Sequence, residues 1–175
     1  KIFSELVEKY PNTILIKNEE RLGFVRSVNK AAKYIENHFV ILNTDTEVPN
    51  GWLERLMYPI FKRENIASTT PFTNAGTVCS FPHFLKDNKI FEGMTVDELD
   101  EVFQFVNPGN SYHSMPSGVG FCMGMNKDVV DKIGMLDEKT FLKGFGEEND
   151  WCMRAREIGY KNVIVPNLFI YHKHG

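Results

Sequence analysis

Short apolar runs alternate with helical patterns over the first 70 residues of the chain. Uninterrupted apolar runs at residues 13–17, 38–43 and 66–70 predict buried strands. Between these runs, apolar side chains recur every three or four residues over 24–35 and 52–61, which predicts two amphipathic helices. Strands that alternate with helices at this spacing are typical of a parallel sheet covered by helices. The sequence therefore predicts an α/β layer.

The rest of the chain contains further predicted elements. An apolar face over residues 1–10 predicts a helix that ends before Pro11, and Asn50 is suited to cap the helix that begins near Trp52. Residues 71–117 lose the regular pattern, apart from one predicted helix over 95–105, and are interpreted as functional loops. The elements predicted after these loops are a strand over 119–125, helices over 126–133 and 147–158, and strands over 162–165 and 169–172.

Composition and charge narrow the class of protein. With 175 residues, 42% of them hydrophobic, the chain can bury the core of one domain. Its 20 basic and 23 acidic residues give a net charge of -3, so the positive field that holds nucleic acid is missing. Cys79, Cys122 and Cys152 have no CxxC spacing, which argues against a disulfide framework or a zinc knuckle and favours the reducing cytosol. No apolar run approaches the roughly 20 residues that cross a bilayer, so membrane contact would be peripheral.

The acid triplet Asp45-Thr46-Glu47 directly follows the apolar run at residues 39–42. It is therefore expected at the carboxyl end of a strand, the edge of an α/β sheet where ligands bind. Two carboxylates at this spacing are suited to hold one Mg²⁺ or Mn²⁺ ion, and a nucleotide diphosphate then completes the coordination. Such triplets are common, however, and a turn followed by a solvated loop acid explains the pattern equally well.

Two further patterns are candidates for phosphate and metal binding. Gly23 precedes a predicted helix on which Arg26 and Asn29 share a face, and a helix start beside a guanidinium attracts phosphate. A turn glycine with two ordinary surface residues explains the same pattern. At the end of the chain, His172 and His174 lie on one face of a predicted strand, and either imidazole is suited to bind a metal. The sequence does not choose between the two histidines.

Three acidic residues follow a glycine-rich turn near the end of the chain. The macrodipole of the predicted helix favours Glu147 and Asp150 in its first turn, and Asp150 is spaced to pair with Arg154. Glu148 differs, because it shares the apolar stripe of Trp151 and therefore points toward the buried side. A carboxylate that is partly removed from water has a raised pKa and is suited to act as a general base.

Several other residues are candidates for a sugar site. They include Asn74 and Gly120, together with Phe81 and Trp151, whose aromatic faces are suited to stack on the C–H surfaces of sugars. A core or turn position also explains each of these residues, and it is the preferred interpretation for Phe81 and Phe121.

Four motifs, taken in order, make the chain resemble glycosyltransferase family 2, the inverting GT-A group. The motifs are residues 21–29, residues 42–53, residues 134–138 and residues 146–155, followed by His172. The resemblance covers almost the whole chain and implies a GT-A-like (Rossmann-like) α/β fold, with a mostly parallel mixed sheet flanked by helices. It also implies a nucleotide-sugar donor and a divalent cation, Mn²⁺ or Mg²⁺.

The resemblance implies a role for each candidate residue. Asp45 and Glu47 match the family's DxD metal motif, and His172 matches a metal ligand of some members, with His174 as the alternative. Glu148 falls at the catalytic base, a position that is commonly Asp, and Asp150 matches the next acid of that motif. The implied donor diphosphate site is Gly23, Arg26, Asn29 and Asp45, and the implied acceptor site is Asn74, Gly120, Glu147 and Trp151.

One part of the family pattern has no counterpart in this sequence. The family opens with a strand, a helix and a second strand that bind the nucleobase and ribose, so the chain is interpreted as truncated at its N-terminus. Within a single domain, residues 1–70 are expected to be the remainder of the nucleotide and metal half, and residues 71–175 the acceptor and catalytic-base half. A sheet without its first strands exposes an edge, for which pairing in a homodimer or another contact is expected.

The sequence thus predicts a metal-dependent inverting glycosyltransferase of polysaccharide biosynthesis, in the cytoplasm or at the inner face of the membrane. It is expected to transfer a sugar from a nucleotide-diphosphate sugar to a hydroxyl of a glycan, polysaccharide or lipid-linked saccharide, without a nucleic-acid partner. Two alternatives remain open: a non-catalytic sugar- or metal-binding fragment, and another metal-dependent transferase such as a nucleotidyltransferase.

Overall fold

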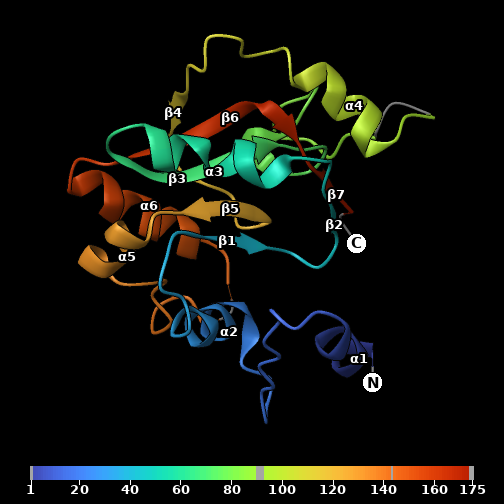
Figure 1. Ribbon diagram of the computed structural model, residues 1–175. Helices are drawn as coiled ribbons and strands as arrows, with labels where there is room; N and C mark the ends of the chain where they lie inside the picture. The colour runs from blue at the N-terminus through green and yellow to red at the C-terminus, as the bar shows by residue number, and fades with distance from the viewer. Residues whose placement is uncertain (1, 90–92, 143, 174–175) are drawn as a thin grey trace.

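The computed structural model describes residues 2–89, 93–142 and 144–173. Its centre is a five-stranded sheet with the order β1-β5-β3-β6-β4 (Figure 1). Strands β1, β3 and β6 run in one direction and β4 and β5 in the other, so β3 and β6 form a parallel pair and the remaining neighbours are antiparallel. The predicted α/β fold, a mixed sheet flanked by helices, is confirmed. The strands are β1 Phe39–Leu42, β3 Ile66–Phe72, β4 His113–Met115, β5 Cys122–Met125 and β6 Lys161–Phe169.

Three helices pack on one face of the sheet: α2 (Gly23–Ala32), α5 (Lys127–Ile133) and α6 (Glu147–Glu157). They match the helices predicted from apolar periodicity, with slightly shorter bounds. Burial of apolar surface, at roughly 25 cal/mol per Å², is the main stabilising contribution here. The buried side chains of this core include Val25, Ile41, Ala67, Met123, Met125, Val129 and Trp151.

Helix α3 (Trp52–Lys62) covers the opposite face of the sheet. Leu56, Met57 and Ile60 are its buried apolar side chains, as the helical spacing predicted. Because successive residues of a strand point to opposite faces, Val40 of β1 packs on this side whereas its neighbour joins the other core.

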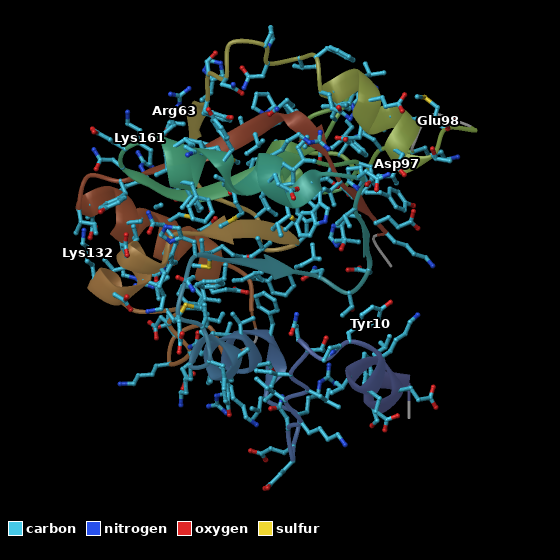
Figure 2. All side chains as sticks on the ribbon, in the orientation of Figure 1. Tyr10, Arg63, Asp97, Glu98, Lys132 and Lys161 are labelled. Carbon is cyan, nitrogen blue, oxygen red and sulfur yellow. The ribbon has the colours of Figure 1, made fainter. Side chains whose placement is uncertain are left out.

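Helix α4 (Val96–Phe103) packs against the end of β6. Its start is fixed by a capping box, in which Thr95 accepts a hydrogen bond from the backbone N–H of Glu98 and the Glu98 carboxylate accepts one from the N–H of Thr95. Figure 2 labels Asp97 and Glu98 on this helix. The Phe103 ring lies 5.2 Å from that of Phe169, in a separate aromatic cluster. The predicted helix over 95–105 is thereby confirmed.

The predicted strand over residues 13–17 is wrong. Helix α1 (Ile2–Lys9) forms as expected, but the following segment is irregular and its Ile14 side chain is 70% exposed (Figure 1). An apolar run becomes a strand only where another strand pairs with its backbone groups. In the described part of the chain, β1 ends the sheet on this side, and residues 13–17 do not pair with it.

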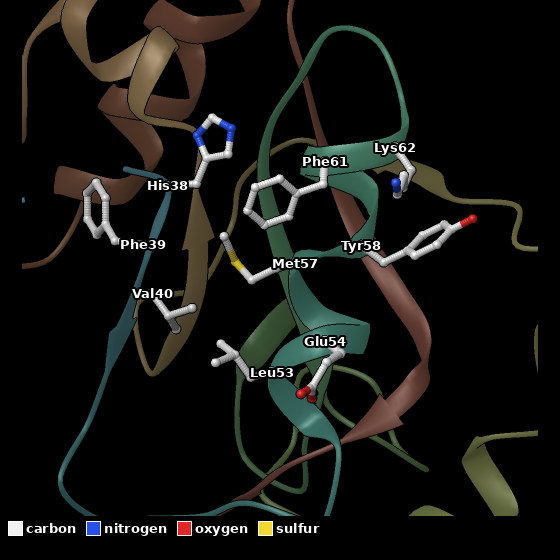
Figure 3. Close-up of a pocket in the computed structure, with 9 residues that line it drawn as sticks. All are labelled: His38, Phe39, Val40, Leu53, Glu54, Met57, Tyr58, Phe61 and Lys62. Atoms are coloured by element: carbon white, nitrogen blue, oxygen red, sulfur yellow. The ribbon is translucent and has the colours of Figure 1, made fainter. Parts of the chain in front are cut away.

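The edge formed by β1 and α3 contains an apolar pocket of about 700 Å³ (Figure 3). Its walls are mainly the side chains of Phe39, Val40, Met57 and Phe61. Glu54 is the single carboxylate among the nine lining residues, so this pocket has no pair of acids for metal or acid–base chemistry. The predicted acidic residues lie at a different edge of the sheet.

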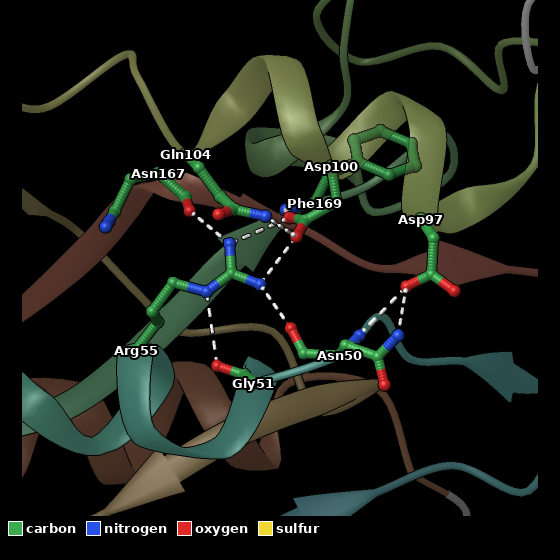
Figure 4. A network of polar contacts seen from close by, with 8 residues as sticks. All are labelled: Asn50, Gly51, Arg55, Asp97, Asp100, Gln104, Asn167 and Phe169. Carbon is green, nitrogen blue, oxygen red and sulfur yellow. Dashed lines mark hydrogen bonds and ion pairs between the residues drawn. The ribbon is translucent and has the colours of Figure 1, made fainter.

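A buried ion pair joins α3 to α4 (Figure 4). Arg55 donates two hydrogen bonds to the carboxylate of Asp100, at 3.1 and 2.5 Å, and a further bond of 2.8 Å to the backbone carbonyl of Asn167. The predicted cap at Asn50 is wrong, because the Asn50 side chain donates to Asp97 instead. Gly51 occupies the cap position in a left-handed conformation, with φ at 65°.

The two strands predicted at the C-terminus, over residues 162–165 and 169–172, are divided at a different place in the structure. Strand β6 continues past Pro166 to Phe169, with a break in its register with β3, because proline is tolerated where a strand bulges. Strand β7 (Tyr171–His172) then leaves the sheet and pairs with β2 (Thr46–Glu47). This small second sheet brings two distant candidate metal ligands together.

Candidate functional site

A polar cavity of about 1120 Å³ opens where the carboxyl ends of β1, β3 and β6 meet the segment that precedes β5. Ligands are expected at such an edge of an α/β sheet. Its walls come from segments that are far apart in sequence: Asn43, residues 75–78, residues 116–121, residues 144–149 and His172. Four of these five segments contain or adjoin a predicted site residue.

Asp45 and His172 lie side by side because β2 and β7 pair. Thr46 is the register partner of His172, and the backbone N–H of Lys173 donates to the carbonyl of Asp45 over 2.8 Å. As a result, Asp45 Oδ1 lies 3.5 Å from His172 Nε2. Two of the predicted metal ligands, more than a hundred residues apart in the chain, are therefore neighbours.

The His172 ring is held in one orientation. Its Nδ1 lies 2.8 Å from the carbonyl oxygen of Ala75, and the ring stacks on Phe121 at 5.1 Å between centroids. Because a carbonyl oxygen only accepts hydrogen bonds, Nδ1 carries a hydrogen, and Nε2 is the ring nitrogen that faces the Asp45 carboxylate. An imidazole nitrogen beside a carboxylate is a suitable pair of ligands for a divalent cation, and the hydrogen bond at Nδ1 is the usual support of a metal-binding histidine.

Asn74 supports His172 and is not among the residues that line the cavity, so its predicted role in acceptor binding stays a prediction. Its side-chain oxygen accepts from the backbone N–H of His172 and its amide nitrogen donates to the His172 carbonyl, each over 2.8 Å. Asn74 is buried and its amide is satisfied by these bonds. It therefore fixes the position of the candidate metal ligand.

The predicted ligand role of Glu47 is not settled by its position. Glu47 lies on β2 opposite Tyr171 and is exposed to solvent. Within residues 2–89, 93–142 and 144–173, no group of three or more His, Cys, Asp or Glu side chains is arranged for metal binding. Its part in the site stays a prediction, and the alternative ligand His174 lies outside the described residues.

Glu148 sits in the first turn of α6 and lines the cavity. Its Oε1 accepts a hydrogen bond of 3.1 Å from the backbone N–H of Gly120. Burial raises the pKa of the Glu148 carboxyl, and the neighbouring Glu147 raises it further, against the lowering effect of the backbone N–H groups of Glu148 and Gly120. The predicted partly buried acid is present, with its pKa shifted in the direction that suits a general base.

Gly120 is needed for this contact, because a Cβ atom at position 120 would lie 2.4 Å from Glu148 Oε1. The two preceding N–H groups are also bound by side chains: Gly118 donates to Cys152 Sγ over 3.2 Å and Val119 donates to Thr70 Oγ1 over 3.3 Å. Residues 118–120 are thus held along α6 and β3. All three cysteines are free and buried, and burial raises the pKa of the Cys152 thiol, as expected of a structural thiol.

Glu147 presents a second carboxylate to the cavity. It is only 4% exposed, and its Oε2 has no hydrogen-bond partner among the described residues. A buried polar oxygen without a partner is costly, so this position of Glu147 is an exception among the buried polar groups of the fold.

Trp151 is not among the residues that line the cavity, and its predicted role in acceptor binding stays a prediction. Its side chain is fully buried in the core under the sheet, and its Nε1 donates to the carbonyl of Gly134 over 2.9 Å. Apolar periodicity placed Trp151 on the same stripe as Glu148 but did not indicate how deeply each residue lies. Trp151 is one turn further into the core.

Asp150 also lies away from the cavity lining. Its carboxylate accepts a 2.8 Å bond from Arg154, as the spacing predicted. Arg154 then donates to the carbonyls of Ile133 and Met135. This arrangement ties α6 to the loop after α5, and direct participation of Asp150 in catalysis stays a prediction.

The residues of the predicted phosphate site at α2 make different contacts in the structure. Asn29 donates to the carbonyl of Leu136 over 2.8 Å and to Glu138 over 3.1 Å, so its amide group holds a loop. Gly23 begins the helix with φ at 78°, and Arg26 is exposed. The donor role of these three residues stays a prediction, since Phe24 is the α2 residue that lines the cavity.

Phe145 is a cavity residue that the sequence did not assign to the site. Phe145 is 95% exposed and has a positive φ of 70°, between Gly144 and Gly146, which also have positive φ values. The Gly-Phe-Gly triplet was the available signal, because glycines on both sides permit an unusual backbone conformation. An exposed loop residue has no periodic pattern that would reveal it.

The fold resembles that of a known enzyme structure. The crystal structure of GalNAc-T7 with UDP, GalNAc and Mn²⁺, a GT-A glycosyltransferase, matches with a TM-score of 0.71 at 15% sequence identity, over 98% of this chain and 34% of that one. This likeness confirms the predicted GT-A-like fold. Among the described residues, no helix has the length and apolar character needed to span a membrane.

Sequence comparison identifies the family. Uncharacterized proteins of Mycobacterium tuberculosis and Mycobacterium bovis are each 29% identical over 137 residues, 78% of this chain and 46% of their own length. The chain thus spans about half the length of these curated relatives. The family profile described as Glycosyl transferase family 2 matches residues 1–134, about three quarters of the sequence. The chain therefore belongs to glycosyl transferase family 2.

Proposed function

We propose that the protein transfers a sugar from a nucleotide-diphosphate sugar to a hydroxyl of a saccharide or lipid-linked saccharide, with inversion at the anomeric carbon. The observation that carries this proposal is the arrangement of one cavity. His172, which lies 3.5 Å from the Asp45 carboxylate, lines this cavity, and a partly buried acid, Glu148, lines it as well. Metal-assisted displacement needs both kinds of group.

Asp45 and His172 would hold the divalent cation, Mn²⁺ or Mg²⁺, with Glu47 as a further ligand. When bound, this cation supplies electrostatic stabilisation of the leaving diphosphate. The hydrogen bond from His172 Nδ1 to the Ala75 carbonyl orients the ring with Nε2 toward Asp45, and Asn74 fixes the backbone of the same residue. The presence of UDP and Mn²⁺ in the GalNAc-T7 structure supports this assignment. Arg26 and Gly23 are proposed to contact the diphosphate.

Glu148 would act as the general base. The N–H of Gly120 holds its Oε1, so its other oxygen is available to take the proton from an acceptor hydroxyl. The acceptor oxygen then forms its bond to the anomeric carbon on the face opposite the diphosphate, whose C–O bond breaks. One such displacement inverts the configuration.

The test is Glu148→Gln in the full chain, with Glu157→Gln on the exposed side of the same helix as control. The amide keeps the size of the side chain but cannot take a proton. Turnover, measured as nucleoside diphosphate released from a panel of nucleotide sugars and saccharides with Mn²⁺, is expected to fall by a factor of about 10² or more. Donor affinity measured by calorimetry is expected to stay unchanged. Full turnover by the Glu148→Gln variant would overturn the assignment of the base.

Related assays separate the two alternative functions. A parallel assay with nucleoside triphosphates and sugar 1-phosphates tests the nucleotidyltransferase alternative, which would form the nucleotide sugar and release pyrophosphate. Binding of donor and saccharide without any turnover by the unmodified chain would identify a binding module.

A further inference from the structure

Phe145 is an aromatic side chain whose exposure the fold does not explain. Its ring is 95% exposed, so it adds almost nothing to core packing. Its backbone is also unfavourable, since a φ of 70° places a residue with a Cβ in the left-handed region. Glycine at this position would form the same turn without that conformational cost. A costly conformation that gains no packing is characteristic of a residue that contacts a ligand.

The position of Phe145 indicates the kind of ligand. It lines the polar cavity and directly precedes the turn into α6, where Glu147 and Glu148 present their carboxylates. Glu147 is buried, with an exposed fraction of 4%, and its Oε2 has no hydrogen-bond partner among the described residues. A ligand for this place needs hydroxyl groups for the carboxylates and an apolar face for the ring. A pyranose has both, because its hydroxyls project from the edge and its C–H groups form a face.

We propose that Phe145 is the platform on which the pyranose ring of the acceptor stacks while its hydroxyl reaches Glu148. This inference rests on the proposed function and adds the residue that selects a cyclic acceptor. It assigns to Phe145 the stacking role that the sequence suggested for Trp151, which is buried in the core. The acceptor is favoured over the donor because Phe145 is joined to the base through the start of α6, whereas Asp45 and His172 are held by the separate β2–β7 sheet.

The experiment compares the full chain with its Phe145→Ala, Phe145→Tyr and Phe145→Gly variants. Binding of methyl β-glucopyranoside, methyl β-galactopyranoside and the methyl glycoside of N-acetylglucosamine is measured by saturation-transfer NMR, in the presence of Mn²⁺ and UDP. Phe145→Ala is expected to weaken glycoside binding by about tenfold, within the range that loss of a stacking aromatic side chain produces at nucleobase sites. Phe145→Tyr is expected to preserve binding.

Two controls separate this role from a structural one. Phe145→Gly is expected to weaken glycoside binding without lowering the melting temperature, because it relieves the left-handed strain and removes no packed surface. Phe105→Ala, at a second phenylalanine that is 82% exposed and lies outside the cavity lining, is expected to leave glycoside binding unchanged.

Three outcomes overturn the inference. The first is that the Phe145→Ala variant binds the glycosides as well as the unmodified chain does, the second is that it loses affinity for UDP instead of for the glycosides, and the third is that the unmodified chain binds no glycoside. A loss of UDP affinity would mean that the ring stacks on the nucleobase. Glycoside binding that depends on Phe145 without any sugar transfer would overturn the proposed function and leave the stacking role intact.

Discussion

The protonation of Glu148 has a consequence for folding stability. Burial holds the pKa of this carboxyl above its ordinary value of 4.5 in the folded protein. Between the unfolded and the folded pKa, the folded protein therefore binds more protons than the unfolded chain. The contribution of Glu148 to the free energy of unfolding is complete below the unfolded pKa and is lost as the pH rises through the folded pKa.

Replacement of Glu148 by Gln is therefore expected to flatten the dependence of stability on pH. Relative to the Glu148→Gln variant, the wild type should lose unfolding free energy as the pH rises from about 4.5 through the raised pKa. Urea unfolding at a series of pH values measures this difference, with the exposed Glu157→Gln variant as reference. Parallel pH profiles for wild type and Glu148→Gln would show that burial does not perturb this carboxyl.

At the residue scale, the sequence predicted which kinds of side chain belong to the site better than it predicted the partners that these side chains contact. Glu148 was recognisable because an acid on an apolar stripe is unusual, and Asp150 was matched to Arg154 by its spacing. Asn74 was identified as a site residue but its partner was not, since its contact is the backbone of a residue 98 positions away. Phe145 gave no periodic signal, because an exposed loop residue is under no constraint from packing.

At the scale of elements, α3, α4 and β6 are joined by the buried Arg55–Asp100 pair (Figure 4). The Asp100 side chain is 1% exposed, and besides Arg55 it accepts a hydrogen bond of 2.9 Å from the backbone N–H of Phe169. Asp100→Ala leaves a largely buried guanidinium and a buried N–H without their acceptor. We expect a loss of about 3–5 kcal/mol of unfolding free energy, measured by urea denaturation.

The matched control for this prediction is Asp131→Ala, which removes the acid of the surface pair with Lys127. The Asp131 side chain is 61% exposed, so its loss is expected to cost no more than about 1 kcal/mol. If Asp100→Ala costs as little as Asp131→Ala, then the buried pair does not hold these elements together.

The elements themselves were largely predictable, because helix periodicity and capping are local properties. Helix α4, for example, lies within the predicted range 95–105, and the capping box that fixes its start joins Thr95 to Glu98, only three residues away. The strand predicted over residues 13–17 does not form, because a strand also requires a neighbouring strand to pair with, and no local sequence pattern shows whether one is present. The same limit explains why the sequence predicted two strands around Pro166 instead of the single strand β6, because the register break that accommodates the proline depends on β3.

At the scale of the whole molecule, the site depends on pairings that are remote in sequence. The antiparallel contact of β2 with β7 places Asp45 beside His172, and the packing of α6 on residues 118–120 places Glu148 at the same cavity. The residue types were predictable from motif order, whereas their distances required the fold. Glu47 illustrates the remaining ambiguity, because its position beside Asp45 in sequence does not bring it to His172.

Metal binding is expected to stabilise the whole fold, since the two proposed ligands come from opposite ends of the chain. At a Mn²⁺ concentration of about 100 times Kd, binding to the folded state contributes about 2.7 kcal/mol, which corresponds to an increase in Tm of roughly 5–10 °C. Asp45→Asn, at a half-exposed side chain, should abolish the increase without disturbing the core, and His172→Gln should do the same. His113→Gln, at an exposed histidine on β4, is the control. An unchanged increase in Tm with Mn²⁺ in the Asp45→Asn variant would exclude this metal site. The Glu47→Gln variant decides the number of ligands. If it loses the increase in Tm, Glu47 is a third ligand, and if it keeps the full increase, the ligands from this chain are Asp45 and His172.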